Sequence, residues 1–365
     1  MIQNLSKLTN TLLMPSSGNI KLYLALVFAF CQIAIATSNA AEPQKLNVFI
    51  WSEYIDPEII TDFEKKFNCK VTLDLYEDNE SMMAKLEGGG TALYDVIVPS
   101  DYVVPALVSR NLVAPLRKEN IPNLKNVEER FLKPPFDKEN TYTMPYQWGT
   151  VGLYVRKQPG KNLEESWSIL FDPAKSYGKF VLLDSMRENI SAALRYKGHS
   201  VNTTDVSILA DVRKMLIDAK SRALGFESGV GGKNKVLGKG VAVAIAYSGD
   251  AVRGMAEDPE TYYFVPKEGG EIWMDSLAIP AKAPNRDLAE KFINYILDPE
   301  VGAKLSNFNQ YPTPNKASRE FINPEDLNNP AIYPTAETMA KLEFLKDLGE
   351  STKVYDEIWT QVKSR

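Results

Sequence analysis

The sequence contains very little histidine and cysteine. Its 365 residues include one histidine, His199, and two cysteines, Cys31 and Cys69. The sequence therefore has too few histidines for a histidine metal cluster, and its single histidine gives a histidine-dependent catalytic triad little support. His199 stands in the loop-like segment Lys197-Gly198-His199-Ser200, which favours a solvated surface position. A metal-binding protein stays open as an alternative, although the single histidine weakens it.

Acidic residues are absent from the first forty positions. This stretch has two lysines and an apolar run from Leu22 to Ala36, and it ends in Ser38-Asn39-Ala40. A run of about fifteen residues is short for a membrane span, and small residues at its end suit cleavage. We expect residues 1–40 to be a signal peptide cleaved near Ala40, with an exported, diffusible product. A retained membrane anchor is the alternative.

A lipid anchor on Cys31 is disfavoured, because the bulky Phe30 before it fits a lipoprotein processing site poorly. Removal of the signal leaves 40 basic residues against 47 acids, a net charge of −7. Such a surface repels nucleic acid and anionic lipid, so we expect no nucleic-acid partner. Cys69 is then the only cysteine, which excludes an intrachain disulfide. About 325 remaining residues favour two domains.

Strand and helix patterns alternate from Leu46 onward. Short apolar or alternating runs predict strands, and amphipathic stretches between them predict helices. The first helix begins at Asp56-Pro57 and buries Ile59, Ile60, Phe63 and Phe67. A second helix is predicted with Asn79 as its cap and an end at Gly88-Gly89-Gly90. The three predicted strands of this half are Leu46–Trp51, Val71–Tyr76 and Tyr94–Val98.

The same alternation returns after a proline-rich stretch, which predicts a second α/β half. Its strand candidates are 150–155, 179–183, 241–247 and 277–281. A helix is expected at 287–297, and a last helical stretch runs through 341–348 and on to Val362. Repeated strand–helix units indicate parallel, doubly wound sheets.

Acidic and aromatic residues follow nearly every predicted strand. Ligands of open parallel sheets lie beyond the carboxyl ends of the strands, so these residues are the first candidates for a site. Acids at helix starts can be simple caps, which is how we interpret Asp78 and Asp101. Aromatic rings beside acids favour an organic cation. The segments are Trp51-Ser52-Glu53-Tyr54, Tyr76-Glu77-Asp78, Ser100-Asp101-Tyr102, Asp184 to Glu188 and Tyr247 to Asp250.

Two enzyme-like patterns fail. Gly231-Gly232-Lys233-Asn234 lacks the earlier glycine and the Ser or Thr of a phosphate-binding loop. Paired carboxylates leave a sugar hydrolase as a rival, but no spacing supports it. We expect a protein that is not an enzyme and needs no cofactor.

Six segments carry a resemblance to a known family. Over nearly the whole mature length, the chain resembles the periplasmic spermidine/putrescine-binding proteins of polyamine ABC transporters. Each segment alone is weak, but all six occur in the family's order. They are Trp51-Ser52-Glu53-Tyr54, Tyr94 to Ser100, Pro145-Tyr146-Gln147-Trp148-Gly149, Pro266 to Gly270, Trp273 to Pro280 and Tyr311 to Asn315.

The resemblance implies an α/β fold of type II with two lobes, each a mainly parallel sheet flanked by helices, and a ligand cleft between them. It places 41–150 with 276–320 in the first lobe, and 151–275 with 321–365 in the second. It also implies a monomer that delivers its polyamine to an ABC permease of the inner membrane, which works with a separate ATPase. A polyamine sensor that docks on a membrane receptor is the alternative.

Roles for single residues follow from the same resemblance. Trp51 and Ser52 would line one side, Glu53 would hold a terminal ammonium, and Asp275 would hold an amine at the centre. Tyr102 would stack, Trp273 would lie along the methylene chain, and Glu188 would reach from the second lobe. The full expected site is Trp51, Ser52, Glu53, Tyr54, Ser100, Tyr102, Ser185, Glu188, Tyr247, Asp250, Trp273 and Asp275.

Three positions depart from the spermidine receptors. Ser185 stands where an acid is expected, Tyr247 where a tryptophan is expected, and Leu345 where a glutamine is expected. Asp250, in contrast, matches an acid of the putrescine-specific relatives. The sequence therefore leaves the preference between spermidine and putrescine open. Core packing of Trp51 and Trp273, and pairing of Glu188 with Arg187, remain the simpler readings of those residues.

Overall fold

A computed structural model of the chain describes residues 43–364. The predicted signal peptide, its cleavage position and Cys31 lie outside this range. Cys69 is buried and unbonded to another cysteine. Within the described residues, no helix is long and apolar enough to cross a membrane.

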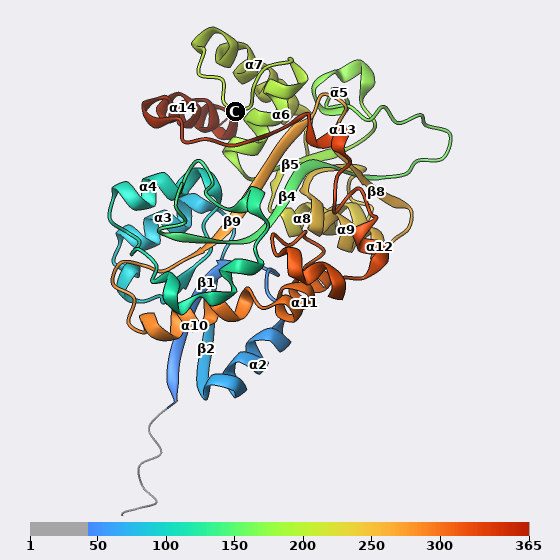
Figure 1. The fold of residues 1–365 in the computed structure, drawn as a ribbon. Helices are drawn as coiled ribbons and strands as arrows, with labels where there is room; N and C mark the ends of the chain where they lie inside the picture. Colours follow the sequence, from blue (N-terminus) through green and yellow to red (C-terminus); the bar gives the residue numbers. More distant parts are fainter. Residues whose placement is uncertain (1–42, 365) are drawn as a thin grey trace, which may run out of the picture. The chain divides into compact units, whose positions relative to one another are not determined.

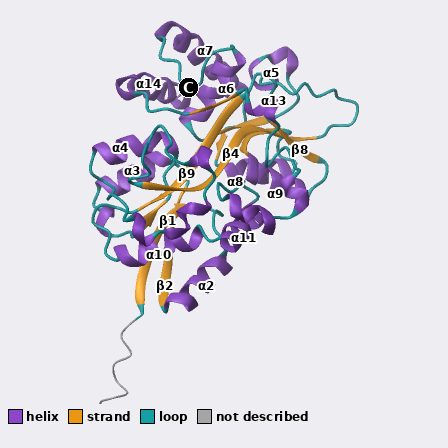
Figure 2. Ribbon diagram, viewed as in Figure 1, coloured by secondary structure: helices purple, strands orange, loops and turns teal. Residues whose placement is uncertain are grey.

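The strands form one connected mixed sheet in the order β2-β1-β3-β9-β4-β7-β5-β6. Figures 1 and 2 show β1, β2, β4 and β9 within it. β10 pairs with β9, and β8 pairs with β4. The strands are β1 (Gln44–Trp51), β2 (Cys69–Tyr76), β3 (Val96–Ile97), β4 (Thr143–Arg156), β5 (Phe180–Leu183), β6 (Phe226–Glu227), β7 (Val243–Tyr247), β8 (Thr261–Phe264), β9 (Gly270–Ala278) and β10 (Leu342–Phe344).

Helices flank this sheet, and several short 3-10 turns connect them (Figure 2). The α-helices are α2 (Pro57–Phe67), α3 (Asn79–Glu87), α4 (Val104–Ser109), α5 (Ser168–Phe171), α6 (Met186–Tyr196), α7 (Val206–Arg222), α8 (Gly229–Leu237), α9 (Ser248–Glu257), α10 (Arg286–Ile296), α11 (Pro299–Asn309), α12 (Pro324–Leu327), α13 (Ala336–Met339) and α14 (Thr352–Ser364).

The sheet contains two sets of parallel strands, as the alternation of strands and helices predicted. β1 pairs in parallel with β2 and β3, and β5 pairs in parallel with β6 and β7. The long strands β4 and β9 run antiparallel to each other and link the two sets, because β9 also pairs with β3 and β4 also pairs with β7. Figure 1 shows both crossing the middle of the described chain. The lobe boundaries at 150, 275 and 320 stay a prediction.

Local sequence signals were sufficient to predict the start and the buried side of the first helix. Asp56 caps α2, and its Oδ1 accepts a hydrogen bond of 2.8 Å from the Glu58 N–H. Ile59, Ile60 and Phe63 are buried, and Phe67 packs against the same core while partly exposed. Asn68 ends the helix in the left-handed region. The predicted start and the buried stripe are confirmed.

Three element predictions need correction. Asp78, and not Asn79, caps α3 by accepting a hydrogen bond of 2.7 Å from the Ser81 N–H, while Asn79 is already helical. The strand expected at 277–281 is the end of β9, which begins at Gly270. Residues 341–348 are not helical, because Leu342–Phe344 pairs with β9 as β10. Pairing with a distant strand overrides helix propensity there.

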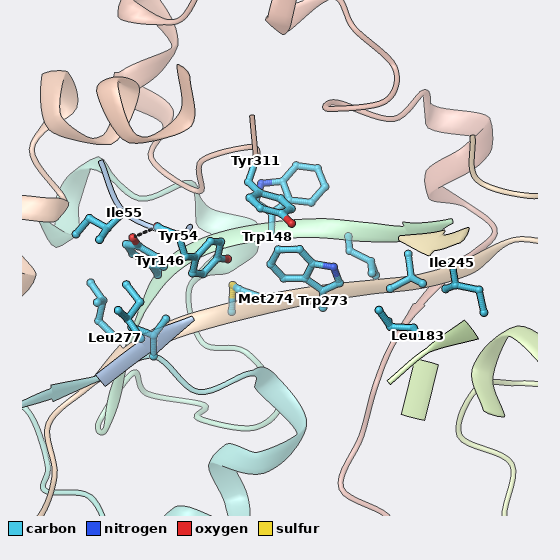
Figure 3. Close-up of a cluster of buried hydrophobic side chains, with 14 of the residues drawn as sticks. Tyr54, Ile55, Tyr146, Trp148, Leu183, Ile245, Trp273, Met274, Leu277 and Tyr311 are labelled. Carbon is cyan, nitrogen blue, oxygen red and sulfur yellow. Dashed lines mark hydrogen bonds between the residues drawn. The ribbon is translucent and has the colours of Figure 1, made fainter. Parts of the chain in front are cut away.

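Aromatic side chains pack around the paired strands β4 and β9 (Figure 3). Trp148 and Tyr146 of β4 are almost fully buried, as are Trp273 and Met274 of β9. The Tyr146 hydroxyl donates to the Tyr54 carbonyl at 2.7 Å, the dashed line in Figure 3. The strands that carry the candidate site therefore rest on a tightly packed centre.

Candidate ligand-binding site

A cavity opens where the carboxyl ends of both parallel strand sets meet β9. Its empty volume is about 640 Å³, including the space open to solvent. The first strand set supplies residues that follow β1, β2 and β3, and the second supplies residues that follow β5 and β7. The lining residues are Trp51, Ser52, Tyr54, Glu77, Ser100, Asp101, Tyr102, Glu188, Gly229, Val230, Tyr247, Asp250, Trp273, Asp275 and Tyr311.

Asp275 lies on β9 and is 5% exposed. The Ser100 hydroxyl donates to its Oδ1 at 2.7 Å, and a β-bridge holds the two residues opposite each other. Burial raises the pKa of the Asp275 carboxyl to about 7, with the hydrogen bond from Ser100 opposing the shift and the charge of Glu188 adding to it. No basic side chain of residues 43–364 forms an ion pair with it. Such a carboxyl group favours an incoming cation.

Glu188 comes from the first turn of α6 and is 6% exposed. The Tyr247 hydroxyl donates to its Oε1 at 3.0 Å, and the Ser185 hydroxyl donates to its Oε2. The neighbouring Arg187 turns elsewhere: it donates to the Lys346 carbonyl at 3.1 Å and lies over the rings of Tyr102 and Tyr355. Within the described chain Glu188 therefore has hydroxyl donors and no basic partner.

The opposite situation holds for Asp250, at the start of α9. The Arg253 Nη2 lies 2.6 Å from its Oδ1. Burial raises the pKa of the Asp250 carboxyl, and the nearby charges of Arg253 and Lys233 oppose this shift. Asp250 is thus a cavity-lining acid whose charge is already compensated by the protein.

Trp273 of β9 lines the cavity, and Figure 3 shows its ring near that of Tyr311. It meets Tyr311 at a centroid distance of 5.2 Å and Tyr247 at 5.9 Å, both edge to face. β4 lies against it at Gly149, where a Cβ would come within 2.5 Å of the Trp273 ring. The missing side chain at Gly149 therefore lets Trp273 lie close to β4. The Trp273 Nε1 has no hydrogen-bond partner among the described residues.

Trp51 and Tyr102 border the cavity from the first strand set. The Trp51 Nε1 donates to the Val98 carbonyl at 2.9 Å, and its ring packs against Tyr76. The Asn79 amide donates to the Tyr102 hydroxyl at 3.1 Å. These contacts fix flat rings at the edge of the cavity. Rings of this kind interact favourably with cations and with methylene groups.

Comparison with known proteins assigns the chain to a family. Residues 58–335 match the family model described as bacterial extracellular solute-binding protein. The chain belongs to this family.

Similar proteins cover nearly the whole chain. The spermidine/putrescine-binding periplasmic protein of Salmonella typhimurium is 32% identical over 91% of this chain and 95% of its own. The putrescine/cadaverine-binding protein of Pseudomonas aeruginosa is 33% identical over 93% and 99%. Among solved structures, the substrate-binding protein of a spermidine/putrescine ABC transporter from Streptococcus pneumoniae is 30% identical, with a TM-score of 0.75 over 88% and 99%. The predicted two-lobe α/β fold is confirmed.

Ten of the twelve expected site residues of this solute-binding protein line the one cavity. Glu53 and Ser185 do not. Glu53 is exposed, has a left-handed backbone (φ 53°) and pairs with Arg253 at 3.0 Å and Lys233 at 3.5 Å. Ser185 lies behind Glu188 and donates to it. Their direct contact with a ligand stays a prediction.

Five lining residues of this solute-binding protein were not among the expected ones. Asp101 was interpreted as a helix cap, which is wrong: its Oδ1 and Oδ2 accept from the N–H groups of Tyr102 and Met274 at 2.7 and 3.3 Å. Glu77 and Tyr311 lie within segments that the sequence singled out. Gly229 and Val230 gave no signal, because only the fold brings α8 to the cavity.

Within residues 43–364, no group of three or more His, Cys, Asp or Glu side chains is arranged to hold an ion. The arrangement of carboxylates and rings instead suits a soluble organic cation.

Proposed function

We propose that this solute-binding protein is an exported receptor that captures a polyamine, spermidine or putrescine, in the cavity and delivers it to an ABC permease. One observation carries the proposal. Glu188 and Asp275 are buried carboxyl groups, lack a basic partner within the described chain, and border the same aromatic cavity. Uncompensated buried acids are costly, and the ammonium groups of a polyamine would compensate them.

The ring positions support a long amine over a compact cation. Trp273 and Tyr247 lie beside the two acids and offer apolar surface to methylene groups. A cation over a ring contributes about 0.5 to 2 kcal/mol, and a charged hydrogen bond roughly 1.5 to 3. Two such hydrogen bonds and two rings together contribute about 4 to 10 kcal/mol before ordering costs, whereas micromolar affinity corresponds to about 8 kcal/mol.

The relatives support the ligand class and the compartment. Those from Salmonella typhimurium and Pseudomonas aeruginosa are named for spermidine, putrescine or cadaverine binding, and the first is periplasmic. We infer the same compartment for this receptor, with residues 1–40 removed as a signal peptide. It acts as a monomer whose two lobes close on the amine, and the difference in affinity between closed and open states drives the switch.

Thermal unfolding with a ligand panel tests the proposal. The protein is melted with putrescine, cadaverine, spermidine, maltose or glutamate. A ligand at a hundred times its Kd stabilises the folded state by about 2.7 kcal/mol, so at least one amine should raise Tm by a few degrees. Maltose and glutamate should not. A shift with maltose or glutamate alone would refute the proposal.

A further inference from the structure

At one end of the cavity, the lining residue Asp250 is paired with a cation that the protein itself provides. The Arg253 guanidinium, from α9, contacts two acids: its Nη2 lies 2.6 Å from Asp250 and 3.0 Å from the Glu53 Oε2. Its Nη1 also donates to the Glu53 carbonyl at 3.2 Å. The Arg253 side chain is only 15% exposed. Arg253 therefore occupies Glu53, which was expected to hold a terminal ammonium, and Asp250, another acid of the expected site.

A second base reinforces this end. Lys233, from α8, has a side chain only 7% exposed, and its Nζ lies 3.5 Å from Glu53. The first residue of α8, Gly229, packs so closely on Asp250 that a Cβ there would lie 2.6 Å from its Oδ2. The positive end of the α8 dipole thus adds to the two bases. Two acids face two bases, and no negative charge is left over.

We propose that Arg253 matches the cavity to a diamine, because it takes the place of the third ammonium of a triamine. This inference rests on the proposed function and names the ligand within it. Glu188 and Asp275 remain for two ammonium groups. The two oxygens of Asp101 are used by backbone N–H groups, and Glu77 lies at the exposed edge, bonded by Ser52.

A triamine finds no third buried carboxylate without a partner among the residues that line the cavity. At the Arg253 end, its extra ammonium group would lose water beside two like charges. On the side of Glu188, the neighbouring Ser185 supplies a hydroxyl group and not a carboxylate. The extra charge is therefore unpaired in either direction.

Calorimetry with putrescine and spermidine tests the inference. The wild-type protein should bind putrescine at least tenfold more tightly than spermidine. Arg253→Gln frees Asp250 and Glu53, so the affinity ratio should move at least tenfold toward spermidine. Arg156→Gln is the matched control, since Arg156 is 14% exposed and bonded to Asp258 at 2.8 Å outside the cavity. Its ratio should equal that of the wild type.

The outcomes separate this inference from the proposed function. A wild-type preference for spermidine, or an unchanged ratio in Arg253→Gln, overturns the inference while polyamine binding stands. Absence of binding by either amine refutes the proposed function itself. Each variant is first melted to show a cooperative transition. If Arg253→Gln has none, Lys233→Gln replaces it, and the ratio must shift in the same direction.

Discussion

At the residue scale, Asp275 is the group on which the proposed chemistry most depends. It lies on β9, beyond the reach of basic side chains in residues 43–364, and Ser100 is its hydroxyl donor. The apolar and aromatic surroundings make its negative charge costly until a cation arrives. An amine that enters the cavity therefore meets a carboxyl group whose ionisation it promotes.

Substitution of Asp275 by asparagine should weaken amine binding strongly. Loss of a charged hydrogen bond of about 1.5 to 3 kcal/mol reduces affinity roughly 10- to 150-fold. Titration calorimetry measures the change. Asp78→Asn is the control, because Asp78 caps α3 outside the cavity and asparagine also accepts from the Ser81 N–H. Asp101 is unsuitable as a control, since it lines the cavity. Equal losses in both variants would show that Asp275 has no special role.

The raised pKa of Asp275 also predicts how stability varies with pH. Its folded-state pKa of about 7 exceeds the ordinary aspartate value, so between pH 4 and 7 the folded state binds more protons than the unfolded state. Stability of the ligand-free protein therefore falls as pH rises through this window, by up to about 4 kcal/mol.

Denaturant unfolding of the ligand-free wild type and of Asp275→Asn at pH 5 and pH 8 measures this pH dependence of the free energy of unfolding. The variant lacks the titrating group, so its free energy of unfolding should exceed that of the wild type by more at pH 8 than at pH 5. A difference in the free energy of unfolding between variant and wild type that is the same at both pH values would contradict the assigned pKa.

At the element scale, the pairing of β4 with β9 builds the centre of the site. Side chains alternate along β9, so Trp273 and Asp275 share a face. Gly149 of β4 lies opposite Trp273, and Gln147 lies opposite Asp275. The ring and the acid are thus held by strands rather than by mobile loops, which fixes their spacing.

Replacement of Gly149 by alanine should disturb this pairing. The new Cβ would lie 2.5 Å from the Trp273 ring and 3.0 Å from the Ser248 Oγ, and such overpacking typically costs about 1 to 3 kcal/mol. Denaturant unfolding and amine titration should both show a loss, because Trp273 must move. Gly232→Ala in α8 is the control: its nearest neighbour is 3.4 Å away, and stability should hold or rise. A neutral Gly149→Ala would show that the close approach is unimportant.

Elements with strong local signals were predictable, and those made by distant contacts were not. The cap at Asp56 and the apolar spacing of α2 are contained within residues 56–67. In contrast, β10 is a strand only because β9 lies beside it. Tyr311 reaches the cavity through the left-handed turn at Gln310, which ends α11, and its contact with Trp273 spans distant parts of the chain.

At the scale of the whole molecule, parallel strand sets explain why the site could be found at all. Loops that follow parallel strands gather at one edge, so residues far apart in sequence, such as Trp51, Glu188 and Asp250, meet in one cavity. The position of loops after parallel strands predicts which residues gather at the cavity, but not which of them form ion pairs. The pair of Arg253 with Asp250 is a local i,i+3 contact on α9, but nothing local shows that Arg253 also reaches Glu53.

The most direct measurement is a crystal structure of the protein grown with putrescine. The account predicts one ammonium nitrogen within hydrogen-bond distance of the Asp275 carboxylate, the other at Glu188, and the methylene chain along Trp273. Putrescine bound elsewhere, or an unoccupied cavity at saturating putrescine, would contradict it.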